Sequence, residues 1–316
     1  MTAVRDLDGR VALVTGGGRG IGFAIATALA ARGAHVVVAD NGTGIDGRGA
    51  DASVAKAAAG TLDTPGAAFT DDIADPDAAA AAVALATDRF GGLDIVVNAA
   101  AILRDALVFK GEPADWDAVI RTNLSAAFYV LAAATPVLRE QAKQGRGGSD
   151  AYQWGRIVNI VSTAGFYGNF GQAAYASAKA GLFGLTRVTA MDMARSGVTC
   201  NAVAPFGATR VTESIRPANP AQESYKARAL TIGAGHVGTF VAWLCGVDAQ
   251  DVTGQLFAVR GRELFLFSQP RPVAEIAKSD GDWDTRTLTT AVTQSLAPAY
   301  TPLETDLEAF DTEPLV

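Results

Sequence analysis

A short apolar run that enters a cluster of glycines constrains this chain more than any other feature. Val11 to Thr15 (VALVT) predicts a buried strand, and residues 16–22 (GGGRGIG) follow it directly. An alanine-rich stretch at 23–32 then predicts a helix. A strand, a glycine turn and a helix in this order are the context in which glycines cradle the phosphates of a dinucleotide. The chain is therefore predicted to begin with a βα unit that holds an anion.

The glycines of this turn have separate expected tasks. Gly16 makes the turn, Gly20 lets a pyrophosphate approach the backbone, and Gly22 lets the helix pack against the strand. Their spacing is G-x-x-x-G-x-G rather than G-x-G-x-x-G, and a turn without a ligand is the alternative. The flanking strand and helix favour nucleotide binding. The residues of this turn that are expected to contact the nucleotide are Gly16, Gly18, Arg19, Gly20 and Ile21.

An acidic residue ends the second expected strand. His35 to Ala39 (HVVVA) is apolar, and Asp40 follows it, 24 residues after Gly16. A carboxylate at this position accepts hydrogen bonds from the adenosine ribose and repels a 2′-phosphate. The expected cofactor is therefore NAD rather than NADP, with an aspartate that only caps a turn as the alternative.

Further strand ends extend the expected nucleotide site. Asp72 and Ile73 follow a short run at 67–69 and fit an adenine pocket, where a carboxylate accepts from the exocyclic amine. Small residues after the next run let the chain pass close to a ribose or nicotinamide. The remaining expected contacts follow the runs at 93–97 and 198–204: Asn98, Ala99, Ala100, Pro205, Gly207 and Thr209.

The residues with the most reactive chemistry lie between Ser162 and Lys179. Ser162 ends an apolar run at 156–161, so its hydroxyl is expected at the edge of a sheet where ligands bind. Tyr175 and Lys179 are four residues apart and share one face of a helix. An ammonium beside a phenol lowers the pKa of the phenol from about 10, so that it can exchange a proton with an alcohol or carbonyl. A surface pair on an ordinary amphipathic helix is the alternative for Tyr175 and Lys179 taken alone.

Other residues add weaker indications. Asn123 falls inside an expected helix at 117–130, where asparagine is unfavourable, so it has either a polar task or a satisfied place in the core. Three aromatic residues near the reacting centre indicate an apolar substrate: Phe166, Tyr167 and Phe170.

Short apolar runs and helical stretches alternate along most of the chain. This rhythm predicts an α/β fold: a single Rossmann-type, doubly wound parallel sheet of about seven strands flanked by helices, over residues 1–267. Pro136 is expected to kink or end its helix, residues 141–154 to form a surface loop, and residues 211–228 to form a substrate lid. Residues 268–316 are predicted to be a C-terminal extension, not an independent domain, with one helical stretch at 287–296.

The charge distribution limits the expected partners. Of the formal net charge of −7, the stretch from Pro270 to the end carries −6, from nine acidic and three basic side chains, and leaves the body nearly neutral. No basic patch indicates nucleic acid or an anionic membrane. Cys200 and Cys245 lack metal or redox spacing, so no metal site is expected. The N-terminus has no apolar signal region, and a cytoplasmic protein is expected.

These residues resemble the short-chain dehydrogenase/reductase family over roughly residues 7–261. The matching elements are TGGGRGIG at 15–22, DI at 72–73, NAA at 98–100, Asn123, Ser162, Tyr175-x-x-x-Lys179 and NAVAP at 201–205. The resemblance implies a catalytic tetrad of Asn123, Ser162, Tyr175 and Lys179, and a homotetramer or dimer. Two positions depart from the family pattern: Ala100 replaces a usual glycine, and Phe206 follows Pro205 where glycine is frequent.

Within the family, the chain looks most like the 3-hydroxyacyl-CoA dehydrogenase unit of the type 2 multifunctional β-oxidation enzyme and its stand-alone bacterial relatives. The similar features are the glycine-rich connection at 41–51, the ILRD run at 102–105 and APFGATRVTE at 204–213. They imply NAD-dependent oxidation of a 3-hydroxyacyl-CoA thioester with a fatty or steroid side chain. The alternatives are a ketone or steroid alcohol dehydrogenase acting on a free alcohol, a 3-oxoacyl thioester reductase, and a non-catalytic dinucleotide-binding protein.

The resemblance also implies a role for each residue of the tetrad. Tyr175 acts as general base on the substrate hydroxyl. Lys179 holds the nicotinamide ribose and, together with the positive nicotinamide, lowers the pKa of Tyr175. Ser162 polarises the substrate oxygen. Asn123 anchors a water that connects Lys179 to solvent.

Overall fold

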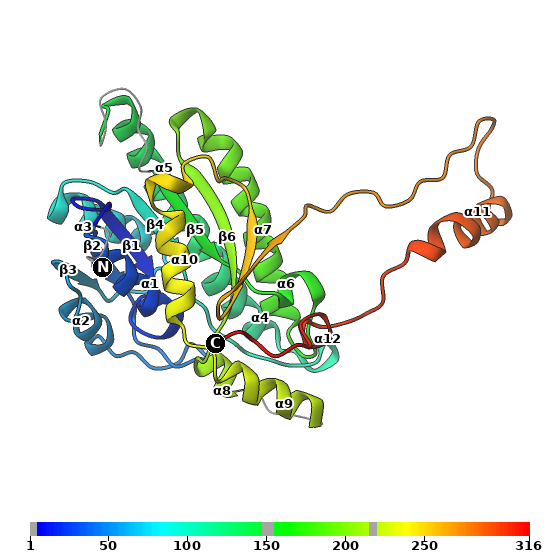
Figure 1. The fold of residues 1–316 in the computed structure, drawn as a ribbon, viewed down its shortest axis with the longest axis horizontal. Coiled ribbons are helices and arrows are strands. Elements are labelled where there is room, and N and C mark those ends of the chain that lie inside the picture. Colours follow the sequence, from blue (N-terminus) through cyan, green and yellow to red (C-terminus); the bar gives the residue numbers. More distant parts are fainter. Residues whose placement is uncertain (1–4, 147–154, 215–219) are drawn as a thin grey trace.

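An eight-stranded sheet forms the centre of the protein, in the order β3-β2-β1-β4-β5-β6-β7-β8 (Figure 1). The computed structural model describes residues 5–146, 155–214 and 220–316. The strands are β1 (Val11–Thr15), β2 (His35–Ala39), β3 (Gly66–Phe69), β4 (Ile95–Asn98), β5 (Arg156–Ile160), β6 (Thr199–Phe206), β7 (Leu256–Arg260) and β8 (Glu263–Phe267). Strands β1 to β7 pair in parallel. Because β1 lies between β2 and β4, the strand order reverses there and opens a crevice at the carboxyl ends.

The central strands form because their residues can be buried on both faces. Val11–Thr15 and Arg156–Ile160 are buried throughout, and β2 is buried beyond His35. Continuous apolar runs of this kind suit parallel strands that helices cover on both sides. The seven predicted strands and their parallel arrangement are confirmed, with boundaries that differ by one or two residues at several ends.

The eighth strand was not predicted. β8 pairs antiparallel with β7 across a two-residue turn, in which Gly261 has a φ of +60°. Phe265 and Phe267 point inward, while Leu264 and Leu266 on the other face are exposed. Period-two alternation over only five residues, directly after a strand, gives a weak sequence signal for a hairpin.

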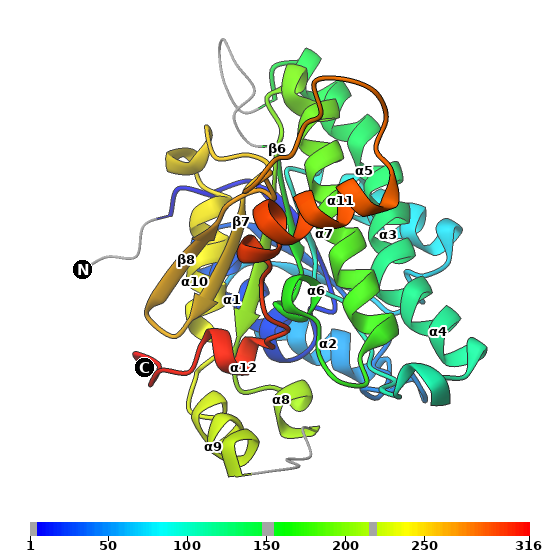
Figure 2. The ribbon, with the colours of Figure 1, turned by 90° about the vertical axis from the view of Figure 1, so that its right-hand side faces the viewer.

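Two helical layers cover the sheet (Figures 1 and 2). Helices α1 (Gly20–Ala31), α2 (Ser53–Gly60) and α10 (Gly235–Leu244) pack on one face, and α1 lies against α10. Helices α3 (Pro76–Phe90), α5 (Ala126–Lys143) and α7 (Ala173–Met193) pack on the other face. Alanines such as Ala79, Ala82 and Ala134 are fully buried and allow close approach of helix and sheet.

Pro136 was expected to kink or end its helix, and it does not end it. Helix α5 continues through Pro136 to Lys143, so the predicted surface loop begins later than residue 141. Pro136 cannot donate to the carbonyl of Ala132, but burial of Ala134 and Leu138 on either side keeps the helix in place. The continuous helix from Pro113 to Lys143 is long and apolar enough to cross a membrane, yet it packs on α3 and the sheet as a core helix does.

The segment predicted as a substrate lid contains two helices. They are α8 (Arg210–Ser214) and α9 (Pro220–Ala229). Residues 215–219 of this segment and residues 147–154 of the predicted surface loop lie outside the described residues.

The C-terminal extension leaves the end of β8 as an arm and then returns to the body (Figure 1). The predicted helical stretch is confirmed as α11 (Thr285–Ala291) and the π turn Val292–Leu296 that continues it. After the arm, α12 (Asp306–Ala309) lies against the body, and Phe310 is buried. The Phe310 ring lies 4.9 Å from that of Phe206 and 5.2 Å from that of Phe265, so the extension joins the core of the main domain.

Replacing Phe310 by alanine is expected to lower the free energy of unfolding by about 3 kcal/mol, the usual cost of truncating a buried phenylalanine. Phe310 is 8% exposed, and its ring contacts other rings from β6, β8 and the short helix α6 (Ala164–Tyr167). Chemical denaturation measures the change. Tyr300→Ala is the control, because Tyr300 is 67% exposed on the arm and should cost little. Equal effects of the two substitutions would contradict the packing described.

Candidate active site

One cavity of about 1130 Å³ lies at the carboxyl ends of the parallel strands. Its volume exceeds the roughly 300–1,000 Å³ common for small-molecule sites, so it has room for more than one ligand. It brings together most of the residues predicted from the sequence: Gly16, Arg19, Gly20, Ile21, Asp40, Asp72, Ile73, Ala99, Ala100, Ser162, Tyr175, Lys179, Pro205, Gly207 and Thr209.

Three predicted site residues do not line this cavity: Gly18, Asn98 and Asn123. The amide of Gly18 donates to Asp40 Oδ2 at 3.0 Å, so Gly18 holds an acid that does face the cavity. Asn98 donates from Nδ2 to Asn159 Oδ1 at 2.8 Å and links β4 to β5 within the sheet. A direct contact of the Asn98 side chain with a cofactor is therefore not supported by its position.

The turn after β1 fits a phosphate group. Gly16 has a φ of +62°, and a Cβ at this position would come within 2.7 Å of the Ala100 Cα. Gly20 has a φ of +55°, a conformation that glycine adopts without strain. Arg19 at the start of α1 makes no side-chain cap, so the first N–H groups of this helix have no capping side chain. Such a helix start favours an anion.

Charges of both signs lie where the adenosine ribose is expected. Asp40 Oδ1 accepts from the Gly42 amide at 2.8 Å, which fixes the carboxylate at the end of β2. Arg19 and Arg210 both donate to the carbonyl of Thr43, at 2.7 and 3.3 Å. Asp40 disfavours a 2′-phosphate, whereas two arginines beside it can attract one.

The reacting centre is built from β5, the loop after it and α7. Lys179 is 2% exposed, and its Nζ donates to the carbonyl of Ile160, the last residue of β5, at 2.7 Å. Nζ also lies 5.7 Å from the centre of the Tyr175 ring. The Ser162 hydroxyl accepts from the Ala164 amide at 3.2 Å, and it lies near enough to the Tyr175 phenol to lower the pKa of that group. Serine, tyrosine and lysine therefore converge on one point of the cavity wall.

The expected lowering of the Tyr175 pKa by Lys179 is not what the geometry gives. Burial raises the pKa of Tyr175 to about 12, a hydrogen bond with Ser162 opposes the rise, and the carboxylates of Asp105 and Asp306 add to it. Burial also lowers the pKa of Lys179 to about 8, because the ammonium is desolvated. The prediction counted the positive charges of Lys179 and of a nicotinamide, and omitted desolvation and the two acids.

Asn123 is fully enclosed in a π turn, Arg121–Ser125, between α4 (Pro113–Ile120) and α5. Its Oδ1 accepts from the Ile102 amide at 2.8 Å, and its Nδ2 donates to the Ile102 carbonyl at 2.9 Å. The side chain thus fixes the loop after β4 and makes no direct contact with Lys179. Single-turn π segments inside helices occur frequently at functional sites.

Several cavity residues were missed in the sequence. Asp105 lines the cavity, and its carboxylate accepts a hydrogen bond from Gln172 Nε2 at 3.1 Å. The ILRD run at 102–105 contains this residue, but the run was used only for the family resemblance. Asp306 and Tyr225 also line it, and neither has a local sequence pattern that marks it. Of the three aromatic residues expected at the substrate, Phe170 lines the cavity. Phe166 packs against Phe183 and Phe267, and Tyr167 packs against Phe310, so both belong to the core.

A tyrosine and lysine that face the carboxyl ends of a parallel sheet, beside an uncapped helix start, define the class of protein. It is an oxidoreductase that works with a bound dinucleotide. The family model described as short chain dehydrogenase matches residues 10–223, and the chain belongs to this family. Members of the family bind a nicotinamide dinucleotide, NAD or NADP.

Three named relatives are similar to this chain over most of its length. The chain is 37% identical to hydroxyacyl-CoA dehydrogenase ChsB1 of Mycobacterium tuberculosis over 288 residues, which cover 91% of this chain and 89% of the relative. It is 37% identical to the 3-oxoacyl-[acyl-carrier-protein] reductase FabG of Vibrio cholerae, over 81% of this chain and 98% of the relative. The mouse peroxisomal multifunctional enzyme type 2 is 35% identical over 82% of this chain, and the match spans 32% of that longer enzyme.

A solved structure confirms the architecture. A short chain dehydrogenase from Mycobacterium avium superimposes with a TM-score of 0.76 at 34% identity. The match covers 95% of this chain and 99% of that structure.

Replacing Asp105 by asparagine is expected to move the alkaline rise of the oxidation rate to lower pH. Tyr175 is the expected general base and would react as the phenolate, so its raised pKa places the rise of kcat/KM at high pH. Removing one nearby negative charge lowers that pKa, while Lys179 and Asp306 still face the phenol. The pH dependence of kcat/KM measures the shift, with Asp88→Asn on the exposed side of α3 as the control. A profile that moves to higher pH would contradict the assigned electrostatics.

Proposed function

We propose that the protein catalyses the NAD-dependent oxidation of a secondary alcohol to a ketone, with a 3-hydroxyacyl-CoA thioester as the substrate. The observation that carries this proposal is the convergence of Ser162, Tyr175 and Lys179 on the same cavity as Asp40 and the start of α1. A fatty or steroid side chain on the thioester is the proposed acyl group, in β-oxidation.

In the proposed mechanism, each side chain of the reacting centre has a separate task. Tyr175 removes the proton of the substrate hydroxyl as general base, and Ser162 positions the oxygen and donates to it as charge develops. A bound oxidised nicotinamide would supply the hydride acceptor for the carbinol carbon and a positive charge to the cavity. Lys179, held by the Ile160 carbonyl, supports the phenolate and binds the nicotinamide ribose.

Proton exchange with solvent is proposed to pass through Lys179. Its pKa of about 8 leaves it able to give and take a proton near neutral pH. The Asn123 side chain is occupied by Ile102, so a water at this end of the path would be bound by the main chain of the π turn. Asn123 then acts by holding that turn in position.

The thioester is supported by the names of two relatives, a hydroxyacyl-CoA dehydrogenase and a multifunctional peroxisomal enzyme. The exposed ring of Phe170 supplies an apolar wall at the cavity for an acyl chain. A free secondary alcohol, such as a steroid alcohol, remains the alternative substrate of the same reaction. We also propose a cytoplasmic homotetramer or homodimer, as in the resembling family.

A second candidate function is the reverse reaction, NADPH-dependent reduction of a 3-oxoacyl thioester. Arg19 and Arg210 beside Asp40 favour it, since both could bind a 2′-phosphate, and reductase relatives match most of the chain. The Asp40 carboxylate, fixed by the amides of Gly18 and Gly42, favours NAD. A dinucleotide-binding protein without activity is a remote third candidate, because it has no need of the serine, tyrosine and lysine that meet here.

Replacing Tyr175 by phenylalanine is expected to lower kcat by about 10²–10⁴-fold, the usual contribution of a positioned general base. The rate is measured as NAD reduction at 340 nm with a panel of 3-hydroxyacyl-CoA thioesters and the corresponding free alcohols. Tyr300→Phe on the arm is the matched control and should retain full activity. Near-normal turnover of Tyr175→Phe would refute the mechanism, and activity on free alcohols alone would refute the thioester.

The unchanged protein is expected to prefer NAD over NADP by at least about tenfold in kcat/KM, since one like-charge contact is worth about 1.4 kcal/mol or more. Asp40→Ala should reduce this preference, because Arg19 and Arg210 then face the 2′-phosphate without an opposing carboxylate. Asp46→Ala in the same loop is the control. A native preference for NADP would instead support the reductase.

A further inference from the structure

The last segment of the chain brings a carboxylate to the wall of the cavity. Asp306 and Leu307 of α12 both line it. Asp306 Oδ2 accepts a hydrogen bond from the Thr163 hydroxyl at 2.7 Å and one from the Tyr225 hydroxyl at 3.4 Å. Thr163 is the neighbour of Ser162, so the acid lies one hydrogen bond away from the loop that carries the reacting serine.

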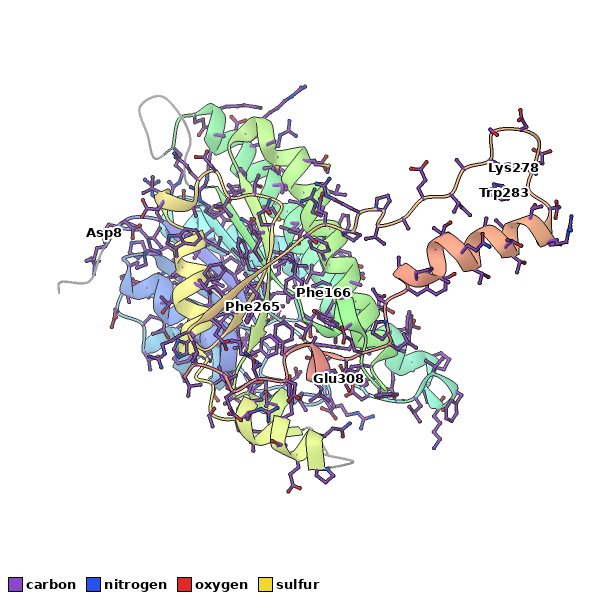
Figure 3. The ribbon with its side chains drawn as sticks, turned by 45° about the vertical axis from the view of Figure 1, so that its right-hand side comes forward. Asp8, Phe166, Phe265, Lys278, Trp283 and Glu308 are labelled. Carbon is purple, nitrogen blue, oxygen red and sulfur yellow. The ribbon has the colours of Figure 1, made fainter. Side chains whose placement is uncertain are left out.

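The position of this acid is fixed by packing and by hydrogen bonds. Thr305 and Glu308 form a capping box at the start of α12. Just after the helix, the Arg260 guanidinium donates to the carbonyls of Phe310 and Thr312, at 2.8 and 3.1 Å. Figure 3 shows Glu308 of α12 at the body, whereas Trp283 and Lys278 lie far out on the arm. The segment that carries Asp306 is therefore held to the body just after α12, and the capping box fixes the start of the helix itself.

The charges around the reacting centre are unevenly distributed. Asp105 and Asp306 both raise the pKa of Tyr175, which places their carboxylates within electrostatic range of the phenol. Two of the basic residues that line the cavity, Arg19 and Arg210, donate to Thr43 on the nucleotide side. The third, Lys179, donates to Ile160. The described part of the substrate side thus presents negative charge to an incoming ligand.

Opposing effects act on the ionisation of Asp306. Burial raises its pKa, and the hydrogen bonds from Thr163 and Tyr225, which favour the ionised form, offset this rise only in part. Its Oδ1 accepts no side-chain hydrogen bond from the described residues, and the carboxylate therefore keeps an acceptor for a ligand.

We propose that Asp306 is a specificity-determining residue that admits substrates without charge near the carbinol and rejects those with a carboxylate there. A 3-hydroxyacyl thioester or ester meets this requirement, because its carbonyl group is neutral, while the corresponding free 3-hydroxy acid is repelled. The inference rests on the proposed function for the identity of the thioester. The exclusion of anions follows from the charge of Asp306 and holds for any secondary alcohol that this site accepts.

The test compares 3-hydroxybutyrate with its ethyl ester, two ligands that differ in charge next to the same carbinol. Their dissociation constants are measured for the complex of the protein with the reduced nucleotide, from the change in nucleotide fluorescence, so that no turnover is needed. The unchanged protein should bind the ester at least tenfold more tightly than the acid. Asp306→Asn should reduce that ratio at least tenfold by improving binding of the acid, with the ester affected less than threefold.

Two further variants distinguish an effect of the Asp306 charge from an effect on the local structure. Asp306→Glu keeps the charge and should keep the discrimination, whereas a purely structural role would be disturbed by both substitutions. Asp311→Asn, an exposed ion-pair partner of Arg228 outside the cavity, should change nothing. An unchanged ratio in Asp306→Asn, or loss of the ratio in Asp306→Glu, would overturn the inference. A protein that discriminates as expected but oxidises only free neutral alcohols would refute the thioester and leave the role of Asp306 intact.

Discussion

The hydrogen bond from Lys179 to the carbonyl of Ile160 is the interaction on which the arrangement of the site depends. A buried ammonium is costly unless it is paired, and this one finds its partner at the end of β5. The bond ties α7 to the edge of the sheet, and Tyr175 is carried on the same helix. Gly165 permits the close approach, because a Cβ there would come within 2.8 Å of the Ala180 amide. The loop with Ser162 can therefore lie directly against the helix with Tyr175.

Burial of this centre has two opposite effects on its acid–base chemistry. It lowers the pKa of Lys179 toward neutrality and raises the pKa of Tyr175 well above it. The phenol is thus a weak acid in its resting surroundings, and positive charge beside it is required before it acts as a base. A buried phenol of this kind acts as a base only when positive charge lies beside it. This requirement couples proton transfer to what occupies the cavity.

Much of the fold could be predicted from the sequence because its signals are local. The apolar runs, the glycine turn and the tyrosine–lysine spacing each depend on residues close together in the chain, and all seven parallel strands follow from them. The continuation of α5 through Pro136 was missed because packing on the sheet overrides the local preference of proline. The hairpin of β8 was missed because five residues give too short a pattern.

The candidate site was also predictable where its signals are local in the sequence. Most of the expected residues meet in one cavity, but burial of Tyr175 raises its pKa, and Asp105 and Asp306, which do not stand out in sequence, add to that rise. Asp306 lies 143 positions after Thr163, its hydrogen-bond partner. A contact of that separation depends on the path of the whole extension, which no local pattern encodes.

The two anchored ends of the arm have a consequence for the integrity of the polypeptide. The arm begins at β8, which is held by the sheet, and ends at Phe310, which is held by the core. A single peptide-bond cleavage between them would leave both fragments attached to the same body through noncovalent contacts. The terminal fragment would then behave as a bound peptide that supplies one wall of the cavity, and its occupancy would depend on concentration. The covalent arm makes that association intramolecular and so keeps the wall in place at any dilution.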